Sequence, residues 1–149
     1  MTLSSLDTNI LVYAADADSK EHGPALALLE DALQRPKEWM LADQVLFEFY
    51  KALRNPRIFR HPLEAGPAAE RVGFLREDSG FLCCCYELEH WPAVFRALQA
   101  SGTPYQRTHD LLLGQTLKAN GVRRFYTRNT KDFEDIGFGE LLNPIDTLP

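Results

Sequence analysis

The sequence predicts an α/β fold in which a mostly parallel sheet is covered by helices on both faces. Short apolar runs alternate along the chain with longer stretches whose apolar residues recur every three or four positions. This alternation is typical of parallel strands joined by helices. The chain has 149 residues and no internal repeat, low-complexity segment or linker rich in Ser and Gly. We therefore expect residues 1–149 to form a single domain.

The elements follow from apolar runs and from residues that begin or end helices. Residues 21–34 carry their apolar side chains on one helical face. Asp43 is expected to cap a helix that runs to about residue 53, and Thr108 to cap one that runs to residues 120–121. Further helices are predicted over residues 9–15, 67–75 and 89–100, with a helical turn at 132–135. The predicted strands are residues 3–6, 39–42, 80–85, 124–127 and 141–142.

Composition and charge narrow the possible functions. No uninterrupted apolar run is longer than the one at residues 10–15, which is far short of the roughly 20 residues that span a bilayer. The N-terminus has no basic segment followed by a long apolar one, so we expect a cytoplasmic protein without a signal peptide. The net charge of −5 argues against a broad basic face that grips duplex DNA.

Basic residues nevertheless gather in two stretches of the chain. One holds Arg54, Arg57, Arg60 and His61, and the other holds Arg123, Arg124, Arg128 and Lys131. Either stretch could meet the phosphates of a nucleic acid, and a solvated surface explains each of these residues equally well.

The three cysteines, Cys83, Cys84 and Cys85, are adjacent. Neighbouring side chains of a strand point to opposite faces, so the three cannot converge on one metal ion. They also lack the Cys-x-x-Cys spacing of zinc sites. We expect them to fill space in a buried strand as small apolar side chains.

Four acidic residues are predicted to form the functional site. Asp7 follows the first strand, at the sheet edge where open α/β folds bind ligands. Glu48 lies at the border of the buried stripe of its helix, where a carboxylate needs a partner. Asp110 stands in the first turn of another helix, and Asp132 follows the fourth strand in a loop. One or more shared cations would account for all four.

The first two acids of the quartet, Asp7 and Glu48, also have ordinary structural explanations. Asp7 could cap the helix that follows it, although Asn9 is an equally good cap. Glu48 could form an ion pair with Lys51 or Arg54.

The acids in the second half of the chain have structural explanations as well. Asp110 could stabilise its helix through the helix dipole. Asn129 and Asp132 could be turn residues. In the functional interpretation, Thr127 would hydrogen-bond a carboxylate or a water, and Asn129 or Asp132 would reach a second metal ion.

An acidic quartet of this kind suits a metal-dependent nuclease. Mg²⁺ and Mn²⁺ prefer oxygen ligands. Ions held by carboxylates lower the pKa of a bound water and stabilise the leaving oxygen of a phosphodiester. The chain has no nucleophile elbow, Walker loop, dinucleotide-binding glycine pattern or His-Glu-x-x-His motif. His109, beside Asp110, could touch the substrate, although a surface or capping role is the simpler explanation.

Four segments together resemble the PIN-domain family, and within it the VapC-type toxin ribonucleases of bacterial toxin–antitoxin pairs. They occur in the family's order and at family-like separations, and Leu142-Asn143-Pro144 closes the pattern. The segments are Leu-Asp-Thr-Asn-Ile-Leu-Val-Tyr at 6–13, Gln-Val-Leu-Phe-Glu-Phe at 44–49, His-Asp-Leu-Leu-Leu-Gly-Gln at 109–115 and Tyr-Thr-Arg-Asn-Thr-Lys-Asp-Phe at 126–133.

The resemblance implies a three-layer α/β/α sandwich, a carboxylate site for Mg²⁺ or Mn²⁺, and endoribonuclease activity. Asp7, Glu48 and Asp110 match the three principal acids of the family. Many relatives carry Asp where this chain has Asn129, which leaves open whether Asn129 or Asp132 completes the site.

The resemblance also implies partners and supporting residues. An RNA substrate, a homodimer and a small antitoxin whose tail enters the groove are expected. Asn9, Thr127 and Asn129 are expected to support the site, and Arg128 and His109 to contact RNA.

Two other functions compete with the nuclease. A non-catalytic PIN-like module that binds RNA or a protein is the main alternative, and retention of the three principal acids argues against it. A phosphoacceptor receiver domain needs an acidic pair at the end of its first strand, where this chain has Ser5-Leu6-Asp7.

Overall fold

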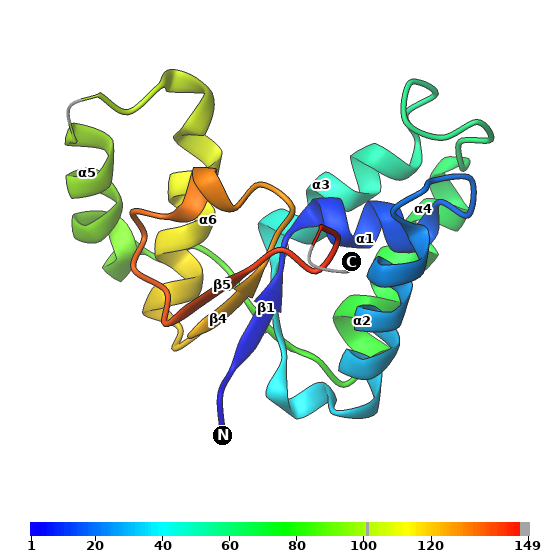
Figure 1. Cartoon of the computed structure of the whole chain (residues 1–149), viewed down its shortest axis with the longest axis horizontal. Coiled ribbons are helices and arrows are strands. Elements are labelled where there is room, and N and C mark those ends of the chain that lie inside the picture. Colours follow the sequence, from blue (N-terminus) through cyan, green and yellow to red (C-terminus); the bar gives the residue numbers. More distant parts are fainter. Residues whose placement is uncertain (101, 147–149) are drawn as a thin grey trace.

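The computed structural model, which describes residues 1–100 and 102–146, is a three-layer α/β/α structure. Helices α1 to α4 lie on one side of the strands, and α5 and α6 lie on the other (Figure 1). The helices are α1 (Thr8–Ala15), α2 (His22–Gln34), α3 (Asp43–Leu53), α4 (Ala65–Gly73), α5 (Trp91–Gln99) and α6 (Thr108–Ala119). The strands are β1 (Ser4–Leu6), β2 (Met40–Ala42), β3 (Leu82–Cys84), β4 (Arg124–Tyr126) and β5 (Glu140–Leu142).

All five strands run parallel, as the alternation of elements predicted. β1, β4 and β5 form one sheet in the order β1-β4-β5, and β2 and β3 form a second. A parallel bridge between Ser4 and Trp39 joins the two. The strands therefore follow the order β3-β2-β1-β4-β5, with β1 at the centre between β2 and β4.

The core lies between these strands and the two helical layers. Leu6 of β1, Leu41 of β2 and Phe125 of β4 are fully buried. Phe125 also packs edge-on against Phe133, with ring centroids 4.8 Å apart. Burying a side chain of this size stabilises the fold by about 1.5–3 kcal/mol. In α3 the buried residues include Val45, Leu46, Phe49 and Leu53, which form the buried stripe that Glu48 was expected to border.

Both predicted helix caps are wrong. Asp43 is the first residue of α3, with Ala42 in the cap position, and its carboxylate instead accepts a 2.7 Å hydrogen bond from Arg76 Nε. Thr108 is the first residue of α6, and its hydroxyl donates to the carbonyl oxygen of Tyr105. A short 3₁₀ turn, Tyr105–Arg107, precedes α6 and shifts the cap position to Arg107.

The cysteines are not the uniformly buried set that the sequence predicted. Cys84 is buried, Cys83 is half-buried and Cys85 is exposed. The reason is that β3 is an edge strand, and only one of its faces meets the core. Burial raises the pKa of the Cys84 thiol to about 12, so this cysteine is a neutral thiol at physiological pH.

The described part of the chain contains no helix that is both long and apolar enough to cross a membrane.

Candidate functional site

The centre of the sheet places the ends of β1 and β4 side by side. The Asp7 backbone N–H donates to the carbonyl oxygen of Tyr126, and the Thr127 N–H donates to that of Leu142. In open parallel sheets, ligands bind in the crevice outside the carboxyl ends of the strands where the strand order reverses. In the order β3-β2-β1-β4-β5 this point lies between β1 and β4, and Asp7 and Thr127 stand at it.

Asp7 is buried and held through both carboxylate oxygens. Oδ1 accepts a 2.8 Å hydrogen bond from the Thr8 backbone N–H, and Oδ2 accepts a 2.7 Å bond from the Thr127 hydroxyl. Asp7 is also the N-cap residue of α1, so it takes the capping role that Asn9 could have filled. The same side chain therefore caps a helix and stands at the strand ends.

Thr127 is fully buried, and the bonding of its hydroxyl fixes where its proton points. The oxygen accepts from the Asn129 backbone N–H at 3.0 Å and from Asn9 Nδ2 at 3.4 Å. Its own proton is left for Asp7 Oδ2. Thr127 and Asn9 thus hold Asp7 in one orientation.

Glu48 projects from α3 toward the same crevice. It accepts hydrogen bonds from the Thr8 hydroxyl at 2.7 Å and from Gln44 Nε2 at 3.3 Å, rather than pairing with Lys51 or Arg54. Gln44 also donates to the backbone carbonyl of His109 at 2.9 Å, which ties α3 to the start of α6.

Thr8 and Gln44 were not among the site residues predicted from the sequence. Gln44 lies one helical turn before Glu48, a spacing at which side chains on a helix surface meet. Thr8 follows Asp7 directly, so one short segment supplies contacts to two of the acids. The Gln44 spacing was visible in the sequence, whereas the contact between Thr8 and Glu48 joins residues 40 positions apart.

Asp110 and Asp132 are half-buried acids whose carboxylates lack protein partners. Within residues 1–100 and 102–146, neither carboxylate takes part in a hydrogen bond or an ion pair. The pKa of Asp110 is raised, chiefly by burial and then by the charges of Asp132 and Glu48. Asp132 therefore acts electrostatically on Asp110, whereas the Asn129 residue is exposed and contacts Thr127 through its backbone.

Negative charge accumulates at this site. The pKa of Asp7 is raised to about 6, mainly by burial, against the lowering effect of its hydrogen bonds, with further increases from the charges of Asp110 and Glu48. An anionic pocket with unpartnered oxygens is suited to a divalent cation. In the described residues no three ligand atoms of the quartet lie within 4.8 Å of one another. An ion held by the quartet in this arrangement would therefore have few protein ligands and would keep several waters, as Mg²⁺ can.

Arg107 connects the segments that carry Asp110 and Asp132. Its guanidinium donates to both carboxylate oxygens of Asp135, at 3.2 and 2.7 Å, and to the backbone carbonyl of Asp132. The Arg107 side chain is only 16% exposed. Because Arg107 directly precedes α6, this contact sets the 3₁₀ turn Thr130–Phe133 against the end of α6 that bears Asp110.

We predict that replacing Arg107 with Ala lowers the free energy of unfolding by about 1–3 kcal/mol, because it leaves Asp135 and a carbonyl without their charged donor. Arg124→Ala is the matched control, since the Arg124–Glu140 pair is more exposed and should contribute about 0–1 kcal/mol. Urea denaturation of both variants measures the difference. Equal losses would show that Arg107 is an ordinary surface residue.

Arg128 follows Thr127 in the loop after β4, and its side chain belongs to a second hydrogen-bond network. Its guanidinium donates to Glu21 at 2.7 Å and to the Tyr13 hydroxyl at 3.1 Å, and lies over the Tyr13 ring. Hydrogen bonds from Ser19 and Arg128 lower the pKa of Glu21 to about 2. Arg128 thereby fastens the loop that contains Thr127 to the turn between α1 and α2.

A second group of possible metal ligands lies away from the quartet, at Glu87, Glu89 and His90. The backbone N–H of Glu87 donates to His90 Nδ1 at 3.0 Å as part of a capping box. In a neutral ring the proton must therefore be on Nε2, which faces Glu89 at 3.8 Å. These contacts describe a helix cap, and they leave His90 no free lone pair for a metal ion.

Comparison with known sequences gives the family. The PIN-domain profile matches residues 5–139. Ribonuclease VapC24 of Mycobacterium tuberculosis is 36% identical over 144 residues, covering 95% of this chain and 96% of that protein. Ribonuclease VapC43 of the same species is 33% identical over 93 residues, which is 62% of this chain and 63% of that protein.

Solved structures give the same fold at lower identity. Mycobacterium tuberculosis VapC20, described as a toxin that cleaves the sarcin–ricin loop, superimposes with a TM-score of 0.68 at 20% identity, covering 91% of this chain and 95% of that one. VapBC2 from Rickettsia felis, bound to a DNA fragment from its promoter, gives 0.66 at 18% identity, with coverages of 95% and 98%. The match to residues 5–139 and the 36% identity over nearly the whole chain show that this protein belongs to the PIN-domain family.

Proposed function

We propose that this protein is a divalent-metal-dependent endoribonuclease and the toxin of a toxin–antitoxin pair. The observation that carries the proposal is the unpartnered pair of carboxylates on Asp110 and Asp132, beside a buried Asp7 whose pKa is raised to about 6. A folded protein keeps such repelling groups together at a cost in stability, and a bound cation removes that cost. Relatives named as VapC ribonucleases support the same chemistry.

The four acids are proposed to hold Mg²⁺ or Mn²⁺. Asp7, Glu48, Asp110 and Asp132 supply the oxygen ligands that both ions prefer. The bound ion would supply a water of lowered pKa and would neutralise charge on the phosphodiester. The chain's own residues orient the carboxylates.

The orienting contacts come from three hydroxyl and amide side chains. Thr127 and Thr8 direct their hydroxyl protons at Asp7 and Glu48, and Gln44 donates a further bond to Glu48. Asn9 and Asn129 act indirectly, through the Thr127 oxygen. Of the two candidates for the fourth position, Asn129 is exposed and contacts Thr127 through its backbone N–H, which favours Asp132.

Two residues, His109 and Arg128, are proposed to contact RNA, and within the described part of the chain only Arg128 is already engaged by other side chains. His109 is exposed at the start of α6, where its imidazole can meet a phosphate or a base. Arg128 has its guanidinium bonded to Glu21 and Tyr13. Contact between Arg128 and RNA would therefore need part of this network to open.

We propose an RNA substrate and a small protein antitoxin as partners. Solved structures of the same fold include VapBC2 from Rickettsia felis and a toxin–antitoxin complex from Klebsiella pneumoniae. A homodimer, a cytoplasmic location and a single domain over residues 1–149 complete the proposal.

The test is cleavage of total RNA by purified, antitoxin-free protein in Mn²⁺, in Mg²⁺ and in EDTA. We expect discrete RNA fragments with either ion and intact RNA in EDTA. Cleavage that continues unchanged in EDTA would refute metal dependence. A folded protein that binds RNA and leaves every species intact would favour the non-catalytic binding module.

A further inference from the structure

A cleft of about 560 Å³ opens between α3 and α6, beside the acidic site. Of the four proposed metal ligands, Glu48 lines the cleft, so whatever occupies the cleft also reaches Glu48. His109 of α6 and Tyr86, in the segment after β3, form part of the opposite wall. The volume is within the range of small-molecule sites and exceeds what a single nucleobase needs.

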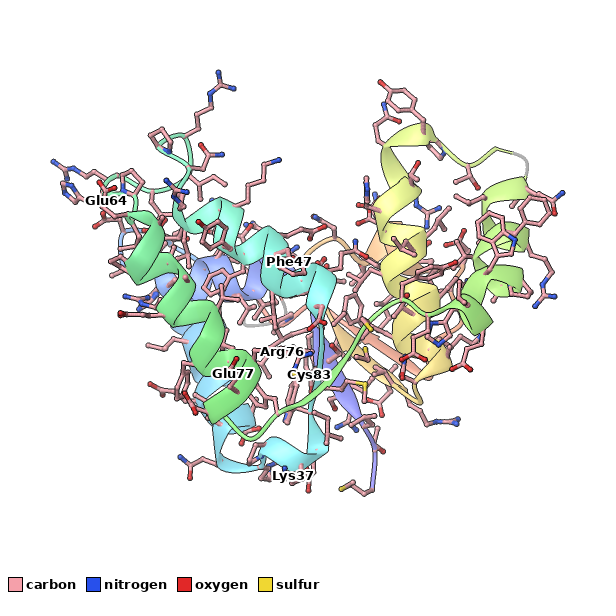
Figure 2. The ribbon with its side chains drawn as sticks, turned by 180° about the vertical axis from the view of Figure 1, so that it is seen from behind. Lys37, Phe47, Glu64, Arg76, Glu77 and Cys83 are labelled. Carbon is pink, nitrogen blue, oxygen red and sulfur yellow. The ribbon has the colours of Figure 1, made fainter. Side chains whose placement is uncertain are left out.

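The cleft walls include two exposed aromatic side chains. Phe47 is 72% exposed and Tyr86 is 41% exposed. The buried stripe of α3 consists of other residues, and Phe47 lies directly before Glu48 on the solvent side of that helix. Figure 2 shows Phe47 on α3, near the middle of the view. The exposure of Phe47 therefore serves no packing within this fold.

A basic stretch continues from the cleft along α3. Lys51 lines the cleft, and Arg54 lies one turn beyond it on the same side of the helix. Residues 49–63 contain these two, Arg57, Arg60 and His61, and no Asp or Glu. Among the described residues none of these five side chains forms an ion pair. In a chain of net charge −5, this strip complements a polyanion that enters the site.

We infer that single-stranded RNA lies along α3, with an unpaired base in the cleft against Phe47 and Tyr86 and its phosphates along Lys51 and Arg54. This inference rests on the proposed ribonuclease function and assigns a base-binding cleft and a phosphate-binding strip along α3 to it. A base seated there brings its neighbouring phosphodiester to Glu48. Aromatic platforms combined with a basic track bind unpaired strands, whereas the bases of a duplex stay stacked on one another.

The first test measures RNA binding to the Asp110→Asn protein in Mg²⁺, which keeps the RNA intact. Fluorescence anisotropy compares a labelled single strand with the duplex of the same sequence. We expect the single strand to bind more tightly, and Phe47→Ala to weaken its binding by about tenfold. Phe74→Ala, at an aromatic residue that is 47% exposed and lines a different groove, should leave binding unchanged. Equal effects of the two substitutions, or equal binding of duplex and single strand, would overturn the inference.

The second test uses a matched pair of lysines. Lys37 is exposed and lies at the bottom of the view in Figure 2, well away from Phe47. Lys51→Gln should reduce the slope of log affinity against log salt by about 0.7 for a single strand, and Lys37→Gln should leave the slope unchanged. Identical slopes for the two variants would show that RNA phosphates do not lie along the basic stretch of α3.

Two controls distinguish this inference from dimer formation at the cleft and from the proposed ribonuclease function. Light scattering reports whether Phe47→Ala changes the molecular mass; a dimer that becomes a monomer with unchanged RNA affinity would assign the cleft to a second copy of the chain. Wild-type protein is tested in parallel for cleavage in Mn²⁺. Cleavage without any effect of Phe47 on RNA binding overturns this inference alone, whereas absence of cleavage counts against the proposed function.

Discussion

Replacing Asp7 with Asn is expected to lower the rate of RNA cleavage by roughly a hundredfold or more. Asp7 is buried at the ends of β1 and β4, and Thr8 and Thr127 fix both of its oxygens. The amide keeps the shape of the carboxylate and removes the charge that a cation needs. Single-turnover cleavage of a defined RNA in Mg²⁺ and in Mn²⁺ measures the loss.

Asp31→Asn is the matched control for this prediction. Asp31 is exposed on α2 and pairs with Arg35, so the same chemical change there should leave the rate unaltered. Thr127→Val tests the orienting contact with Asp7, and a loss of about 10–100-fold is expected, as for partners that orient metal ligands elsewhere. An Asp7→Asn protein that is folded and cleaves at the wild-type rate would exclude Asp7 from the reaction.

The metal-free protein is expected to lose about 2–3 kcal/mol of stability as the pH rises from about 4 to about 6. Burial raises the pKa of Asp7 from 3.8 to about 6, so between these values the folded state holds a proton that the unfolded chain has released. Stability falls with rising pH wherever the folded state binds more protons. Below pH 4 this penalty is absent, and above pH 6 it is fully present.

Saturating Mg²⁺ or Mn²⁺ should reverse this loss at neutral pH, because the cation binds the folded state and neutralises the carboxylates. Thermal or urea unfolding with and without metal provides the measurement. Asp7→Asn and Asp110→Asn should each reduce the stabilisation by metal while leaving the metal-free fold at least as stable as the wild type. Equal stabilisation of the wild type and both variants would place the metal elsewhere.

The sequence was sufficient for the fold and for the contact between Asp7 and Thr127. The apolar runs ending at Leu6 and Tyr126 were recognisable as strands, and a parallel sheet brings such strand ends to one edge. Asp7 and Thr127 therefore met as expected. The buried stripe of α3 likewise followed from helical spacing, which placed Glu48 at its border.

Most contacts between side chains of different elements could not be predicted from the sequence. Whether Glu48 pairs with Lys51 or accepts from Thr8 depends on how α1 packs against α3, and local spacing carries no information about that packing. Arg107 was missed for the same reason, because its partners lie about 25 residues later in the chain. The caps failed at Asp43 and Thr108 because a distant arginine and a preceding 3₁₀ turn supplied competing partners.

The most direct test of the carboxylate metal site is a crystal structure of the protein soaked in Mn²⁺, with anomalous diffraction used to locate the ion. An anomalous peak within coordination distance of Asp7 and Asp110 is the predicted result. The Glu87, Glu89 and His90 group provides an internal comparison, and it should stay free of metal. A peak at that group with none at the strand ends would contradict the proposed site and the mechanism built on it.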